Sequence, residues 1–163
     1  DFISERHELD SSVYDNFSIH ECVKDIAESD MDTLIVFDRL CFPAERALFL
    51  NTWLNAPHAR TLYYKENGEY KGYAVMRQCF QGYKIGPLFA DNNRVAAALL
   101  NSMLTHANKE SVYIDVPDAN DRAQEFIQSY NTTIQFACMR MYKNGKPDFD
   151  LNRVYGISTF ELG

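Results

Sequence analysis

The chain has 163 residues, of which 46% are hydrophobic and 24% are charged, so it can bury a substantial core within a single domain. The formal net charge is -7 and no basic stripe is present, which argues against a nucleic-acid partner. No long apolar run and no signal peptide are recognisable, so we expect no membrane association and an intracellular, cytoplasmic location.

The first residues differ in character from the rest of the chain. Residues 1–17 are polar and show no periodicity, and we interpret them as a linker or N-terminal arm. Because the chain starts with Asp1 and not with methionine, we expect a fragment or a processed product, with a preceding domain in the same polypeptide. The folded domain is then predicted to span residues 18–163. Its first strand is predicted at 17–23, where apolar and polar residues alternate.

Two helices and a meander of strands are predicted next. Ser29 precedes two aspartates, which is typical of a helix start, and Pro43 at a first helical position predicts a second helix over 44–54. Strands at 61–64 and 70–80 flank an Asn-Gly pair that favours a tight hairpin turn. A Gln-Gly pair then turns the chain into a third antiparallel strand.

This third strand carries the most informative pattern. It starts at Tyr83 and is interrupted by Gly86-Pro87, and since proline has no N–H to donate, the hydrogen-bonded ladder must fail on one side there. A polar loop at 91–93 leads into an alanine-rich helix. The unpaired strand edge can accept an extended ligand that carries amides, and the helix N-terminus favours an anion. Coenzyme A, a pyrophosphate attached to a pantetheine arm, meets both demands.

The remaining segments alternate between strands and helices. Strands are predicted at 111–116, 134–142 and 154–162, and a helix begins after Asp118. Because a helix separates the interrupted strand from the strand at 111–116, we expect these two to be parallel neighbours. The predicted fold class is α/β (α+β), a mixed central sheet of about seven strands flanked by about four helices.

Several stretches resemble one family. They are HECVKDIAESDMDTLI near the start, GYKIGPLFADN at the interrupted strand, VYIDVPDANDRAQEFIQSY, RMY and the ending YGISTFELG. Together with the order of elements, they resemble the GNAT superfamily of N-acetyltransferases, in a divergent GNAT-like subgroup that is often the C-terminal of two tandem domains. The resemblance covers about residues 18–163 and implies a GNAT-like fold that is splayed between strands 4 and 5.

The resemblance also implies a cosubstrate site. In this family the splayed strands hold the pantetheine of acetyl-CoA or another acyl-CoA, and the loop that opens the next helix holds the pyrophosphate. The residues that would line this site are Leu88, Phe89, Ala90, Asn92, Asn93, Arg94, Val95, Ala96 and Asn120. Only Ala96 matches the family's pyrophosphate loop, and Asp91 brings negative charge toward the diphosphate. Arg94 is expected either to pair with a phosphate or to be an ordinary solvated charge.

The expected catalytic groups depart from the family pattern. The family's general acid, a tyrosine in the helix after the fifth strand, corresponds here to Ile127, which has no proton to give. Asp115 on the fifth strand is the candidate general base, and a locally hydrogen-bonded role at the strand end is the alternative. Backbone amides near Leu88 are expected to polarise the thioester carbonyl.

We therefore expect an acyl-CoA-dependent N-acyltransferase that moves an acetyl group from its thioester to a small-molecule or other amine acceptor. The alternative is a degenerate, non-catalytic GNAT domain that binds coenzyme A or a partner beside an active domain, as the departures at Asp91, Arg94 and Ile127 would allow. The histidines lie on separate elements, so we expect no metal. The cysteines are far apart and are expected to be buried free thiols, although their spacing alone leaves disulfides open.

Overall fold

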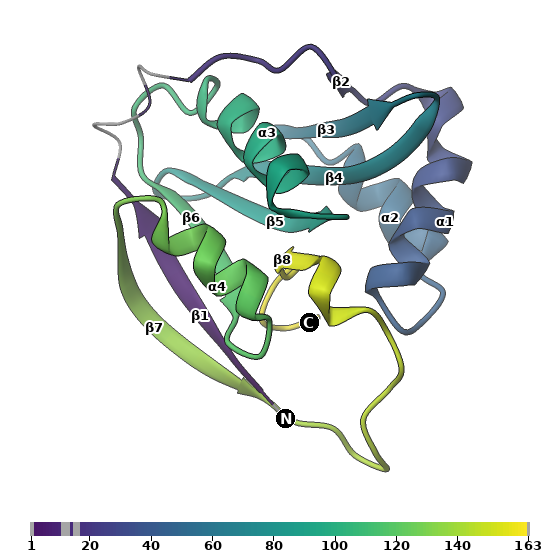
Figure 1. Cartoon of the computed structure of the whole chain (residues 1–163), viewed down its shortest axis with the longest axis vertical. Helices are drawn as coiled ribbons and strands as arrows, with labels where there is room; N and C mark the ends of the chain where they lie inside the picture. The colour runs from purple at the N-terminus through teal and green to yellow at the C-terminus, as the bar shows by residue number, and fades with distance from the viewer. Residues whose placement is uncertain (1, 11–13, 15–16, 163) are drawn as a thin grey trace.

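The computed structural model describes residues 2–10, 14 and 17–162. Their strands form one mixed sheet of eight strands in the order β2-β3-β4-β5-β6-β1-β7, and β8 pairs with β5 outside this path (Figure 1). The strands are β1 (Phe2–Leu9), β2 (Val23–Asp25), β3 (Ala59–Glu66), β4 (Glu69–Gln78), β5 (Tyr83–Ala90), β6 (Val112–Pro117), β7 (Thr132–Arg140) and β8 (Val154–Gly156). The helices are α1 (Met31–Cys41), α2 (Ala47–Leu54), α3 (Asn93–Leu104) and α4 (Asp121–Gln128). The predicted mixed α/β architecture is therefore confirmed.

Helices cover both faces of this sheet (Figure 1). Along β3, Tyr64 belongs to the core beneath α3 and α4, whereas its neighbour Tyr63 belongs to the core beneath α1 and α2. This alternation follows from the pleat of a strand, which points successive side chains to opposite faces. The sheet thus separates two apolar cores, and both are built from residues of the central strands.

Residues 2–9 correct the prediction of a polar arm. They form β1, which lies between β6 and β7 and is antiparallel to both. Phe2 and Leu9 are buried, and so are the polar Ser4 and His7, which obscure the alternating pattern in the sequence. Residues 1, 11–13, 15 and 16 of the predicted arm lie outside the described residues.

The predicted local elements are confirmed with changes in their bounds. The hairpin between β3 and β4 turns at Asn67 and Gly68, with φ of 52° and 83°, as an Asn-Gly turn requires. The helix expected after Ser29 is present as α1, preceded by a 3-10 turn at Glu28–Asp30. The second helix begins at Ala47, so Pro43 is not at a first helical position. The strand predicted at 17–23 is wrong except at its last residue, since β2 begins at Val23, and the strand predicted at 154–162 is reduced to β8.

Candidate functional site

β5 and β6, the fourth and fifth strands of the predicted sheet, pair over only part of their length. They run parallel, and their pairing covers Tyr83–Ile85 on β5 and Val112–Ile114 on β6. Gly86-Pro87 follows directly, and the proline has no N–H with which to continue the ladder. The predicted failure of the ladder on one side at Gly86-Pro87 and the splay between these strands are confirmed, whereas β5 itself continues without interruption to Ala90.

The slot between the diverging strands holds strand β8 of the same chain. β8 is antiparallel to β5, with Leu88 opposite Gly156 and Phe89 opposite Val154. On the other side, the Ile157 N–H donates to the Asp115 carbonyl oxygen at 2.9 Å. The prediction that this edge of β5 is free for a ligand is therefore wrong for the conformation described. Leu88, Phe89 and Ala90 are fully buried.

The N-terminus of α3 also packs against β8. Asn92 caps this helix, because its side-chain oxygen accepts a hydrogen bond from the Val95 N–H at 3.1 Å. The next residue, Asn93, accepts a hydrogen bond of 2.5 Å from the Tyr155 hydroxyl on β8. Val95 and Ala96 are buried in the core. The predicted pyrophosphate loop is thus well ordered by contacts within the chain.

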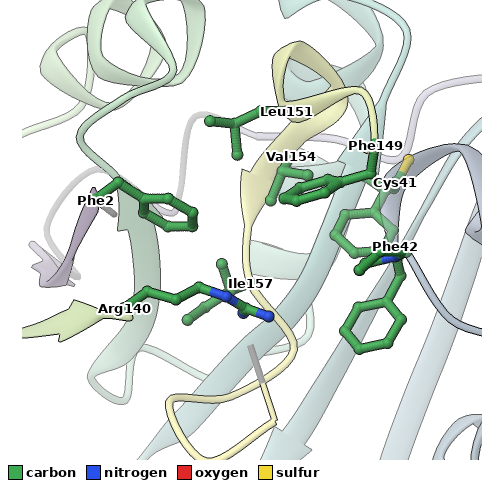
Figure 2. A pocket seen from close by; sticks show the side chains of 10 residues that line it. Phe2, Cys41, Phe42, Arg140, Phe149, Leu151, Val154 and Ile157 are labelled. Carbon is green, nitrogen blue, oxygen red and sulfur yellow. The ribbon is translucent and has the colours of Figure 1, made fainter. Parts of the chain in front are cut away.

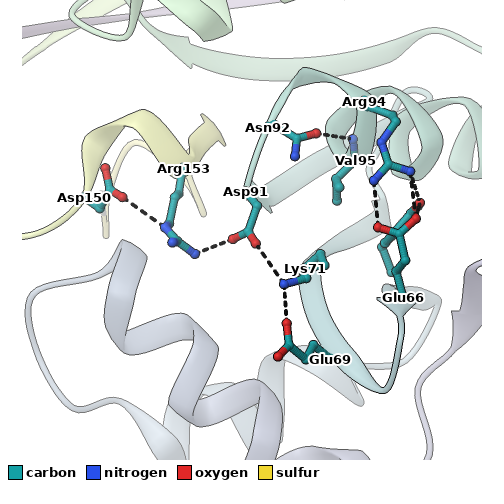
Figure 3. Close-up of polar contacts among 10 residues, drawn as sticks. Glu66, Glu69, Lys71, Asp91, Asn92, Arg94, Val95, Asp150 and Arg153 are labelled. Carbon is teal, nitrogen blue, oxygen red and sulfur yellow. Dashed lines mark hydrogen bonds and ion pairs between the residues drawn. The ribbon is translucent and has the colours of Figure 1, made fainter.

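The charged residues of that loop have partners within the chain (Figure 3). Asp91 forms an ion pair with Arg153, which lies just before β8, and lies 3.9 Å from the Lys71 ammonium. Arg94 donates to the Glu66 carboxylate at 2.7 Å and to the Tyr64 hydroxyl at 2.7 Å. The hydrogen bond with Arg94 lowers the pKa of Glu66. Arg94 is therefore a largely exposed helix charge in a surface ion pair, which agrees with the second of its two predicted roles.

Asn120 connects α4 to β8. Its Oδ1 caps the helix by accepting from the N–H groups of Arg122 and Ala123, at 3.1 and 3.3 Å. Its Nδ2 donates to the carbonyl oxygens of Leu151 and Val154, both at 2.9 Å. The amide is buried, so all of these bonds are made away from water. Asn120 was predicted to contact a ligand in the slot, and in the structure it contacts the segment of the chain that fills the slot.

Asp115 is buried between two cations. Arg6 on β1 donates to both of its carboxylate oxygens, at 2.8 and 3.0 Å, and Lys84 on β5 forms an ion pair with it. Burial lowers the pKa of Lys84 to about 8, and the Asp115 carboxylate opposes this shift. Both oxygens of this buried carboxylate are thus occupied by cations of the chain, and no contact among the described residues directs either oxygen toward the edge of β5 that faces the slot. Sequence reasoning missed both cations: Arg6 lay in the assumed arm, and the available signal for Lys84 was a charge between apolar residues of the strand.

A second buried ion pair lies on the α1 and α2 side of the slot. Arg46 donates to both carboxylate oxygens of Asp38, at 2.8 and 2.6 Å, and to the Ser158 hydroxyl at 2.9 Å. The Tyr73 hydroxyl donates to the same carboxylate at 2.6 Å. This network fixes the segment after β8 against α1.

An apolar hollow beside β8 offers no room for a ligand (Figure 2). It is lined mainly by aromatic and aliphatic side chains, among them Phe2, Phe42, Phe149, Val154 and Ile157. Its volume is about 10 Å³, which is roughly the space of one water molecule.

Three further features of the chain bear on its function: membrane-spanning helices, metal ligands and cysteines. No helix among the described residues is long and apolar enough to cross a membrane. Within the same part of the chain, no group of three or more histidine, cysteine or acidic side chains is arranged to hold a metal ion. All four cysteines are free, but only Cys41 is buried: Cys22 is partly exposed, and the prediction of buried thiols is wrong for the exposed Cys79 and Cys138.

Comparison with protein families decides the family of this chain. A model described as an acetyltransferase (GNAT) domain matches residues 34–156, which is most of the sequence and includes β3 to β8. The chain belongs to the GNAT acetyltransferase family. This membership supports acyl transfer as the general class of chemistry.

Individual relatives of this GNAT chain are distant. Holothin acyltransferase from Pseudoalteromonas sp. (strain SANK 73390) is 24% identical over 142 residues, which cover 86% of this chain and 48% of that protein. A provisionally named acetyltransferase from Pyrococcus horikoshii has a TM-score of 0.75 at 24% identity, covering all of this chain and 52% of that one. An aminoglycoside acetyltransferase from an uncultured soil metagenomic sample, solved with sisomicin, has a TM-score of 0.53 at 19% identity, covering 76% and 95%. The structural likenesses establish the fold, and the chain spans about half the length of the first two relatives.

Proposed function

We propose that this domain is an acyl-CoA-dependent N-acyltransferase, with acetyl-CoA as the cosubstrate and a small amine as the acceptor. The observation that carries this proposal is the divergence of β5 from β6 after Ile85, beside the N-terminus of α3. A β-strand edge next to a helix N-terminus suits a ligand that combines an extended amide-bearing arm with a pyrophosphate. In the reaction, the amine nitrogen attacks the thioester carbonyl, the carbon–sulfur bond breaks, and the amine proton ends on the coenzyme A sulfur.

The proposal requires β8 to leave the slot. The edge of β5 that would bind the pantetheine arm pairs with β8 at only two positions, Leu88 with Gly156 and Phe89 with Val154. A ligand strand could replace these few backbone hydrogen bonds, each of which is worth about 1 kcal/mol. Release of β8 would also expose the buried Tyr155 and break its hydrogen bond to Asn93, so the ligand must offset that loss as well. Only molecules in which β8 has left the slot can bind the ligand. The apparent Kd therefore equals the intrinsic Kd divided by the fraction of such molecules.

One observation favours a second candidate, a GNAT domain without catalytic activity. β8 fills the slot and contacts Asn93 and Asn120, which were predicted to bind the ligand. Ile127, at the position of the family's usual acid, is buried and has no ionisable group. A domain with its own strand in the ligand slot would serve as a structural or binding module beside an active domain.

Calorimetry with acetyl-CoA, on the wild-type chain and on a variant that loosens β8, tests the first candidate. A Cβ on Gly156 would lie 2.9 Å from two side-chain atoms of Ile114, so Gly156→Ala should push β8 from the slot. We expect Gly156→Ala to bind acetyl-CoA several-fold more tightly than the wild type. The double variant Gly156→Ala with Ile114→Ala removes the colliding atoms and should restore the wild-type affinity.

The outcomes separate the two candidates. Binding with turnover of a primary amine supports the acyltransferase. Binding without turnover across a broad panel of amines supports the non-catalytic domain. If neither the wild type nor Gly156→Ala gives heat or thermal stabilisation at millimolar acetyl-CoA, the proposal that this slot takes acyl-CoA is overturned.

A further inference from the structure

A second pocket, separate from the slot that β8 fills, lies on the other half of the sheet. Its volume is about 490 Å³, and its lining includes Arg6, Arg77, Lys84, Phe80 and Phe136. The pairing of the strands explains how these side chains meet. Arg77 is opposite Lys84 across β4 and β5, and Arg6 is opposite Phe136 across β1 and β7. Residues opposite each other in a sheet point to the same face.

Sequence alternation shows which face this is. Met76 and Ile85, the neighbours of Arg77 and Lys84, belong to the core beneath α3 and α4. Arg77 and Lys84 therefore point to the opposite face, where α1 and α2 lie. These two helices contact the sheet mainly at β4 and β3, and Trp53 of α2 also reaches β5. The pocket lies beyond that contact, toward β6, β1 and β7.

The charges that face this pocket are unbalanced. Arg6 and Lys84 share the Asp115 carboxylate, and Glu161 acts on both of them from a distance. Three cations thus face two carboxylates, in a chain whose formal net charge is -7. The local surplus is positive, so the pocket would attract an anionic group.

Arg77 is the cation without an ion-pair partner, and Glu161 and Asp115 act on it only from a distance. Among the described residues it takes part in no ion pair, and its Nε is buried without a hydrogen-bond partner. Its guanidinium carbon lies 3.9 Å from the centre of the Trp53 ring, which positions it but does not neutralise it. A buried polar group without a partner is costly, and a planar guanidinium matches a carboxylate through two parallel hydrogen bonds. A ligand carboxylate would supply the missing partner.

Aromatic rings supply the apolar part of the pocket. Phe80 is fully exposed and Phe136 is about half exposed, at 46% of its surface. Exposed rings beside a cation are suited to a ligand that has an apolar or aromatic body and one charged end. The pocket also adjoins the point at which β5 leaves β6, because the Trp53 Nε1–H donates to the Gly86 carbonyl oxygen at 3.0 Å.

We propose that this pocket binds the carboxylate of an amine acceptor with an aromatic or other apolar body, with Arg77 as the residue that pairs with the carboxylate. The assignment of this ligand as the acceptor rests on the proposed acyl transfer, whereas the binding of an aromatic carboxylate does not. An aromatic amino acid has the required chemistry: one amine to acylate, one carboxylate for Arg77, and one ring for the wall formed by Phe80 and Phe136.

Binding is tested first, without acetyl-CoA. The chain has one tryptophan, Trp53, and it lies against Arg77, so its fluorescence reports directly on this pocket. We expect 3-phenylpropanoate to change the fluorescence in a saturable manner, and its neutral amide 3-phenylpropanamide to have no comparable effect. Arg77→Gln should weaken binding of the carboxylate at least tenfold. Arg122→Gln, an exposed arginine on α4, should leave it unchanged.

Turnover is tested second, with acetyl-CoA and two matched amines. We expect kcat/KM to be at least tenfold higher for L-phenylalanine than for 2-phenylethylamine, and Arg77→Gln to remove this preference. If acetyl-CoA does not bind at all, the proposed function fails while the fluorescence result still decides the pocket. Equal responses to the carboxylate and its amide, or wild-type binding by Arg77→Gln, would overturn the inference.

Discussion

A Cβ atom on Gly86 would lie 2.5 Å from the carbonyl oxygen of Ser158. The backbone of β5 therefore touches the backbone of the segment after β8 at the very residue where β5 and β6 part. The Ile157 carbonyl oxygen is almost as close, at 2.6 Å from the same position. Glycine is needed at this position because a side chain would collide with the backbone of the segment after β8.

Gly86→Ala is expected to destabilise this junction. A methyl group cannot share space with two backbone carbonyls, so β5 or the segment after β8 must shift, at a cost of about 1–3 kcal/mol. Urea unfolding would measure the loss of stability, and hydrogen exchange of the Ile157 amide, which bonds to Asp115, would report the release of β8. Unchanged stability and exchange would show that the segment is not held at Gly86 in solution.

The strands and helix near this junction could be predicted from the sequence. The presence of β8 in the slot between β5 and β6 could not. Gly86-Pro87 predicts a break in the hydrogen-bonded ladder, because proline has no N–H. A helix between two strands predicts that the strands are parallel neighbours. The destination of β8 depends instead on distant partners: Gly156 fits beneath Ile114, and Val154 bonds to Asn120. A strand of three residues carries too little pattern to indicate which edge it joins.

The misassigned N-terminal segment shows the same limit. β1 buries Ser4 and His7 beside its apolar ends, so its alternation is disguised by polar residues. Arg6 of this strand donates a hydrogen bond to Asp115, which is 109 residues away in the chain. Only the folded sheet brings these two together, and the candidate base Asp115 acquires its two cationic partners through that long-range contact.

Asn120→Asp is expected to separate helix capping from the contact with β8. Aspartate retains the oxygen that caps α4, but it loses both donations to the carbonyls of Leu151 and Val154. Leaving these buried acceptors unpaired beside a carboxylate should cost about 1–3 kcal/mol in urea unfolding. Asn101→Asp is the matched control, because it keeps the oxygen that accepts from Tyr130 and should cost only about 0.5 kcal/mol through a negative charge in the last turn of α3. Equal costs would contradict the role given to Asn120.

The lowered pKa of Lys84 predicts a specific pH dependence. Its pKa falls from 10.5 in the unfolded chain to about 8 in the folded one, chiefly through burial, with Arg6 and Arg77 adding to the shift and Asp115 opposing it. Between these values the unfolded state binds more protons, so the contribution of Lys84 makes stability rise with pH, by at most about 1.4 kcal/mol per unit. This contribution is fully present above 10.5 and is lost as the pH falls through 8.

Comparison with Lys84→Met isolates this contribution. The free energy of unfolding would be measured from pH 7.5 to 10.5 for both proteins, and the difference between them removes the titration of every other group. We expect the wild type to gain stability relative to the variant as the pH rises. A difference that is flat, or that falls with pH, would show that the Lys84 ammonium is not disfavoured by folding.

Asp38→Asn should be among the most destabilising single changes on the α1 side. The Asp38 carboxylate is buried and accepts two hydrogen bonds from Arg46 and one from Tyr73. The substitution preserves size but leaves a buried guanidinium without its counter-charge, which costs about 3–5 kcal/mol. Asp25→Asn is the control, since the pair of Asp25 with Arg60 is exposed and worth at most about 1 kcal/mol. Raising the salt concentration should weaken only the exposed pair. Similar losses for both variants in urea unfolding would contradict the assignment of Asp38 and Arg46 as a desolvated pair.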